Sequence, residues 1–197
     1  QLFLDYNMKF SETEIEHLFK AWLAISLAFA ILLSKGNVFS SDFGIMLLVS
    51  GFTVGLGFLL HELGHKYVAQ KYHCFAEFRA FTPMLILAVA MSFLGFIFAA
   101  PGAVMINGHV NRERNGKISV AGPLVNIGLA IIFLGLTLIG FVNMFTQYGL
   151  LINAWLATFN MIPFWNLDGK KILRWDKRVY FSLLVGGIAL LLASGFV

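Results

Sequence analysis

The segment 43-FGIMLLVSGFTVGLGFLLHELGHKYVAQK-71 decides how the rest of the chain can fold. Residues Phe43–Leu60 carry no charged side chain, and their number falls within the roughly 17–25 residues that a helix needs to cross a bilayer. The apolar run continues into the polar stretch His61–Tyr72 without a proline. We therefore predict one membrane-crossing helix whose polar end lies at the bilayer edge or in a cavity lined by protein.

The remaining composition is that of a membrane protein. Hydrophobic residues make up 59% of the 197 residues and charged residues only 12%, whereas soluble domains carry roughly a quarter charged residues. Further runs without any charge cover Ala80–Gly108, Ile118–Leu167 and Val179–Val197. We predict an all-α polytopic membrane protein with about five to six transmembrane helices in contact with the lipid bilayer.

Local patterns place the other helices. Ser11-Glu12-Thr13-Glu14 is typical of a capping box, in which the Ser hydroxyl and the Glu carboxylate each bind a backbone amide at a helix start. The first helix is expected to run from this box to Ser34, and Asn143–Tyr148 is expected to be a polar turn. Later helices are predicted from after Lys117 to about Val142, over Gly149–Phe159, and from Val179 onwards.

The region 75–110 has a mixed pattern. Phe75–Phe81 alternates polar and apolar residues as a strand does, whereas Ala80–Ala100 is apolar but interrupted by Pro83 and Gly95. This region either crosses the membrane once or dips in and returns as a small re-entrant or β region. Non-helical backbone at that depth is tolerated where protein buries it or where it lines a wet cavity.

The motif His61-Glu62-Leu63-Gly64-His65 carries the chemistry. Its i, i+4 spacing puts both imidazoles on one helix face, where they can bind one Zn²⁺, and Glu62 at the edge of that face can act as general acid/base without ligating the ion. The alternative is a chance pattern of two core histidines and a surface glutamate. Ionisable side chains at membrane depth are costly, which favours the zinc site.

Catalytic zinc usually takes three protein ligands, and Asp168 is the best candidate for the third. It is the first charged residue after the long apolar run, and Pro163 and Gly169 permit an irregular backbone around it. The alternative is an ordinary carboxylate at a helix boundary. Asp168 can meet His65 only if both lie on the same membrane side, which requires 80–100 to return rather than cross.

The basic residues favour the returning arrangement. In it, every Lys and Arg except Lys35 falls on the side of the histidines, as the positive-inside rule expects, so the zinc site is predicted near the cytoplasmic side of the cell membrane. Because the basic residues flank apolar spans, the net charge of +4 does not indicate nucleic-acid binding. The single Cys74 excludes an intramolecular disulfide.

Three motifs in order resemble the site-2 protease family of intramembrane zinc metallopeptidases. These are His61–His65, Ala121-Gly122-Pro123-Leu124-Val125-Asn126, and Asn160-Met161-Ile162-Pro163 followed by Leu167-Asp168-Gly169. The resemblance implies hydrolysis of peptide bonds in or near transmembrane segments, with ligands His61, His65 and Asp168. It also implies Glu62 as the catalytic residue and a membrane-protein substrate with a transmembrane helix.

The resemblance further places Asn160 near the site, either as a donor to the substrate or its oxyanion or in a helix–helix hydrogen bond. We expect one metallopeptidase domain over residues 1–197, with a core of about 43–174 and no appended soluble domain. Asn126 and Asn153 are interpreted as packing residues, and the strand after the zinc helix as an edge to which an unwound substrate segment adds. Alternatives are a membrane zinc peptidase of the prenyl-protein-processing type, a transporter, and a catalytically silent scaffold.

Overall fold

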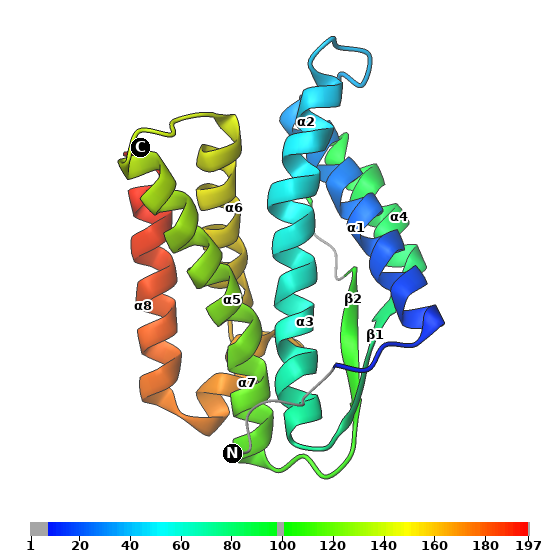
Figure 1. Ribbon diagram of the computed structural model, residues 1–197, viewed down its shortest axis with the longest axis vertical. Helices are drawn as coiled ribbons and strands as arrows, with labels where there is room; N and C mark the ends of the chain where they lie inside the picture. The colour runs from blue at the N-terminus through cyan, green and yellow to red at the C-terminus, as the bar shows by residue number, and fades with distance from the viewer. Residues whose placement is uncertain (1–7, 98–100, 197) are drawn as a thin grey trace.

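The computed structural model describes residues 8–97 and 101–196 and is mostly helical, with one two-stranded sheet (Figure 1). The elements, in chain order, are α1 (Glu12–Leu33), α2 (Phe43–Ser50), a π-helical turn η1 (Gly51–Gly55), α3 (Leu56–Lys71), β1 (Phe75–Ala80), α4 (Thr82–Ser92), β2 (Gly102–Asn107), α5 (Arg112–Leu138), α6 (Met144–Asn160), α7 (Asp168–Trp175) and α8 (Lys177–Ala193).

Three helical segments in the described ranges are long and apolar enough to cross a membrane: α1, the continuous helix Phe43–Lys71 and α5. The second of these confirms the helix predicted from the opening segment, although the π-helical turn inside it was not foreseen. The turn packs against α1, where Trp22 Nε1 donates to the Gly51 carbonyl oxygen over 3.0 Å. The count of about five to six spans is not confirmed by helix length and composition.

The starts of α5 and α6 correct two predictions. Helix α5 begins at Arg112 rather than after Lys117 because the side chain of Asn111 accepts from the Arg114 amide and caps the helix. The predicted polar turn Asn143–Tyr148 is wrong, since α6 already begins at Met144. Asn143 and Thr146 form a reciprocal capping box there, with Thr146 in the position where the motif usually has Glu or Gln.

The chain between 80 and 102 leaves the sheet and returns to it. The strand predicted over Phe75–Phe81 is present as β1, which pairs antiparallel with β2, and Ala80 lies opposite Gly102 at one end of the ladder. Along the chain, the short apolar helix α4 lies between β1 and β2. The apolar segment therefore comes back to the point where it left, which keeps α3 and α7 at the same end of the molecule (Figure 1).

Helix α1 covers the outer edge of β1. Ser11 Oγ caps α1 by accepting from the Glu14 amide, as predicted, but the Glu14 carboxylate does not return to Ser11. It accepts instead from the Phe78 amide over 2.9 Å, while His17 Nδ1 accepts from the Ala80 amide over 3.2 Å. The Phe78 and Ala80 amides of β1, which point away from β2, are thus already bonded.

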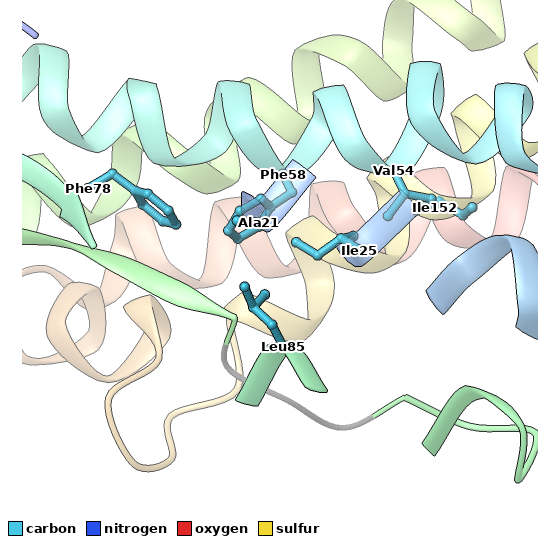
Figure 2. Packing of buried hydrophobic residues seen from close by; sticks show 7 residues of the cluster. All are labelled: Ala21, Ile25, Val54, Phe58, Phe78, Leu85 and Ile152. Atoms are coloured by element: carbon cyan, nitrogen blue, oxygen red, sulfur yellow. The ribbon is translucent and has the colours of Figure 1, made fainter. Parts of the chain in front are cut away.

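A buried apolar cluster joins α1, η1, α3 and α6 to the hairpin, by which we mean β1, α4 and β2. Figure 2 shows its side chains converging between these elements. The members are Ala21, Ile25, Val54, Phe58, Phe78, Leu85 and Ile152. Between helices in a bilayer, such contacts stabilise the fold through van der Waals packing. The cluster fixes α1 and the hairpin against the helix that carries the HExxH motif.

Candidate metal centre and active site

The structure brings His61, His65 and Asp168 together as a group that could hold a metal ion, and all three side chains are buried. The two histidines lie one turn apart on α3, as the i, i+4 spacing predicts. Asp168 is the first residue of α7, and the close approach of Gly169 to the Met161 backbone leaves no room there for a side chain. The end of α6 and the start of α7 are therefore packed together.

The outer ring nitrogens of both histidines are bound to protein acceptors. His65 Nδ1 lies 2.8 Å from the Ile118 carbonyl oxygen and His61 Nδ1 lies 2.6 Å from Asn126 Oδ1. A carbonyl oxygen only accepts, so His65 carries a proton on Nδ1, and Nε2 is the nitrogen left to bind a metal ion. The Nε2 atoms face each other and the carboxylate, an arrangement of electron pairs that a cation stabilises.

The distances within this group fit zinc. The Nε2 atoms are 3.1 Å apart, and Asp168 Oδ2 lies 3.3 Å from His61 Nε2 and 3.0 Å from His65 Nε2. Tetrahedral Zn²⁺ with bonds of about 2.0–2.1 Å separates its ligand atoms by about 3.3 Å. Gly122 borders the same space, since a Cβ on it would collide with the Nε2 atoms of both histidines.

Asp168 is ionised in this environment. Burial opposes its ionisation, but the positive charge that the imidazoles of His65 and His61 carry when protonated outweighs burial and holds the pKa of the Asp168 carboxyl well below its ordinary value. Its other oxygen, Oδ1, lies 3.5 Å from Lys171 Nζ. Oδ2 therefore remains directed at the histidines, in the deprotonated form that metal binding requires.

Glu62 lies beside the group but outside it. Its buried carboxylate interacts electrostatically with both histidines and with Asp168, and it is bonded to the backbone amide of Val104 on β2. Both Glu62 and the metal-binding group line a cavity of about 530 Å³ whose other walls are largely apolar, formed by parts of α1, α4, β2 and α6. Walls of this kind favour contact with apolar groups.

Asn160 lines the same cavity, but its Nδ2 donates to the Leu156 carbonyl oxygen of its own helix over 3.0 Å. No helix–helix hydrogen bond from Asn160 is present among the described residues. Its contact with a substrate stays a prediction. Asn126 and Asn153 were interpreted from the sequence as packing residues, but hydrogen bonds connect them to His61. The sequence could not distinguish a packing asparagine from one bonded to His61, because that contact joins residues far apart in the chain.

Comparison with known proteins identifies the kind of site. The chain is 38% identical over 179 residues to a Methanocaldococcus jannaschii protein provisionally named zinc metalloprotease MJ0611, with 87% of this chain and 89% of that protein covered. The chain belongs to this zinc metalloprotease family. It is also 29% identical over 167 residues to zinc metalloprotease MJ0392 of the same organism, covering 82% of this chain and 41% of that longer protein.

No protein-family model matches the chain, and no solved structure matches it significantly. For a member of a zinc metalloprotease family, the cofactor is Zn²⁺, as predicted, and the group of His61, His65 and Asp168 could hold it. The apolar helices of this metalloprotease are consistent with a membrane protein.

Proposed function

We propose that this metalloprotease is an intramembrane endopeptidase of the site-2 protease type, which hydrolyses peptide bonds in or near the transmembrane segments of other membrane proteins. The observation that carries the proposal is the position of the metal-binding group. It lies at the polar end of an apolar helix and opens into an apolar cavity. A site for soluble peptides would have no need of such walls.

His61, His65 and Asp168 are the proposed zinc ligands. A zinc ion held there supplies Lewis-acid polarisation of the scissile carbonyl and makes a water molecule more acidic. The Glu62 carboxylate takes a proton from the attacking water and then gives it to the leaving amine nitrogen. The water oxygen first forms a C–O bond to the carbonyl carbon, and the C–N bond then breaks as the nitrogen takes the proton, so the products are a carboxylate and an amine. Asn160 is proposed to donate to the substrate or its oxyanion.

The substrate strand is proposed to add to β2, not to β1. The sequence-based hypothesis of addition at β1 is contradicted by α1, whose Glu14 and His17 already accept from its outward amides. In an antiparallel ladder alternate residues direct their amides to opposite sides, so the register places those of Gly102, Val104 and Ile106 on the outer edge of β2. The Val104 amide is bonded to Glu62, so a substrate strand is proposed to pair with the amides of Gly102 and Ile106. This edge lines the cavity next to Glu62.

The membrane placement is part of the proposal. Helices α6 and α8 have 17 residues each, about 26 Å of helix, and we propose that they cross the bilayer alongside the three long helices. The α1–α2 connection, with Lys35, lies at the end opposite α7 and the α3–β1 connection (Figure 1). This supports a metal site near the cytoplasmic side of a cell membrane.

The proposal is tested by comparing the wild-type protein with Glu62→Gln for zinc content and for cleavage of a model protein with one transmembrane helix. Glu113→Gln, which alters an exposed carboxylate paired with Lys117, is the control. Retained zinc with lost cleavage is expected for Glu62→Gln alone. Equal cleavage by both variants would remove Glu62 from the chemistry, whereas a zinc-loaded wild type that cleaves nothing would favour a silent scaffold.

A prenyl-processing peptidase with a glutamate as third ligand has less support. The two candidate residues, Glu77 and Glu113, pair with Arg79 and Lys117 and are not members of the metal-binding group found in the described ranges.

A further inference from the structure

Two buried amide side chains connect three helices next to the metal-binding group. Asn126 of α5 and Asn153 of α6 are both fully buried. Asn126 Nδ2 donates to the Gly57 carbonyl oxygen over 3.1 Å and to Asn153 Oδ1 over 3.0 Å, and Asn153 Nδ2 donates to the Gly149 carbonyl oxygen over 2.9 Å. The remaining polar atom, Asn126 Oδ1, lies 2.6 Å from His61 Nδ1.

The direction of this network is fixed by backbone carbonyl groups. Because the Gly149 carbonyl only accepts, Asn153 must turn its Nδ2 towards it and its Oδ1 towards Asn126. Because the Gly57 carbonyl and Asn153 Oδ1 both accept, Asn126 must turn its Nδ2 towards them. Asn126 Oδ1 is therefore an acceptor for His61, and the His61 proton must sit on Nδ1.

Space for this network is provided by a glycine. A Cβ on Gly57 would lie 2.5 Å from Asn153 Oδ1, so any other residue would displace the Asn153 amide from its place in the network. The orientation of each histidine depends on a different partner. His65 is oriented by the backbone of Ile118, whereas His61 is oriented by side chains that substitution can remove.

We propose that Asn126, held in orientation by Asn153, is a positioning residue that fixes the tautomer and ring plane of His61 for zinc. This inference rests on the proposed role of His61 as a ligand. Asn126 borders the cavity but is not a member of the metal-binding group; it acts through the imidazole, which it holds with Nε2 facing Asp168. Loss of such a partner typically weakens metal affinity by about 10–100-fold.

The test compares Asn126→Leu with Asn126→Asp. Leucine keeps the volume but removes the acceptor, whereas aspartate keeps the acceptor and places a carboxylate in a buried site. A residue needed only for packing would tolerate leucine better than aspartate, because burying a charge is costly. A positioning residue gives the opposite order. We therefore expect the zinc dissociation constant, measured by chelator competition in detergent, to rise about 10–100-fold for leucine and less for aspartate.

The absorption spectrum of the Co²⁺-substituted protein gives a readout independent of activity, and we expect it to change in Asn126→Leu. Asn153→Leu should weaken zinc binding by a smaller factor, and it decides the question if Asn126→Leu does not fold. Thr137→Val, which removes a buried hydroxyl bonded to Phe133 on the same helix, is the control and should bind zinc normally.

Zinc affinity within twofold of wild type in the folded leucine variants would overturn the inference while leaving the proposed function intact. A wild-type protein that binds no zinc would instead overturn the proposed function. The order aspartate worse than leucine would assign Asn126 to packing.

Discussion

Glu14 of α1 and Lys66 of α3 form an ion pair from which solvent is fully excluded. Lys66 follows the proposed ligand His65 directly, and the other oxygen of Glu14 accepts from the Phe78 amide of β1. The Phe10 ring lies 4.1 Å from the Lys66 ammonium and completes its surroundings. One carboxylate therefore joins the first helix, the metal-binding helix and the hairpin that borders the cavity.

Removal of Lys66 should destabilise the protein strongly. Lys66→Met leaves the Glu14 carboxylate buried without its counter-charge, which costs about 3–5 kcal/mol and should lower the melting temperature in detergent by about 6–20 °C. The double variant Glu14→Leu/Lys66→Met should recover most of this loss. Lys20→Met, which breaks an exposed pair with Glu16 on α1, should show no measurable shift. A Lys66→Met protein as stable as Lys20→Met would contradict this reading.

Gly122→Ala should impair zinc binding more than folding. A methyl group at this position would meet the Nε2 atoms of His61 and His65, where the metal ligands converge. We expect zinc affinity to fall by at least about tenfold, the lower end of the range for disturbed metal sites. Gly128→Ala on the same helix has open space around it and is the matched control. Equal zinc affinity in both variants, measured by chelator competition, would show that the site adapts.

Removing the metal should lower thermal stability. A ligand at about 1,000 times its dissociation constant stabilises the folded state by about 4 kcal/mol, so chelation should lower the melting temperature by about 8–16 °C and added Zn²⁺ should restore it. Asp168→Asn should abolish the response to zinc, whereas Glu62→Gln should keep it. A scanning experiment with and without chelator measures both. A full zinc response in Asp168→Asn would exclude this residue as a ligand.

The substitution Ile106→Pro should weaken substrate binding without loss of zinc. The substitution removes an amide from the outer edge of β2, and one missing hydrogen bond of about 0.5–1.5 kcal/mol should raise KM roughly 2–13-fold. Ile106→Ala keeps the amide and reports the effect of the side chain alone, so the KM of the proline variant should exceed that of the alanine variant. Equal KM values in the two variants would argue against strand addition at β2.

The parts predicted correctly from the sequence depend on short-range patterns. The i, i+4 spacing placed His61 and His65 on one face, and alternation over Phe75–Phe81 gave β1. The proximity of Asp168 came from long-range reasoning: the unequal distribution of Lys and Arg required residues 80–100 to return, and the pairing of Ala80 with Gly102 shows that they do.

The parts that were missed depend on tertiary contacts or on unusual capping. The sequence of β2 looks like the end of an apolar run, because its residues do not alternate between polar and apolar. It is a strand because it pairs with β1. The start of α6 was missed because Thr146 replaces the usual Glu or Gln of a capping box. Glu14 had the correct local pattern, yet the buried Lys66 ammonium and the Phe78 amide bind its carboxylate in place of the Ser11 amide.

The metal-binding group draws on two segments that the ribosome makes at very different times. Helix α3 is synthesised well before α7, and the amide network that orients His61 additionally requires α6. A nascent chain therefore has no complete metal site until the segment through Asp168 has been made and inserted. The proposed proteolysis is therefore expected only after α7 has reached α3.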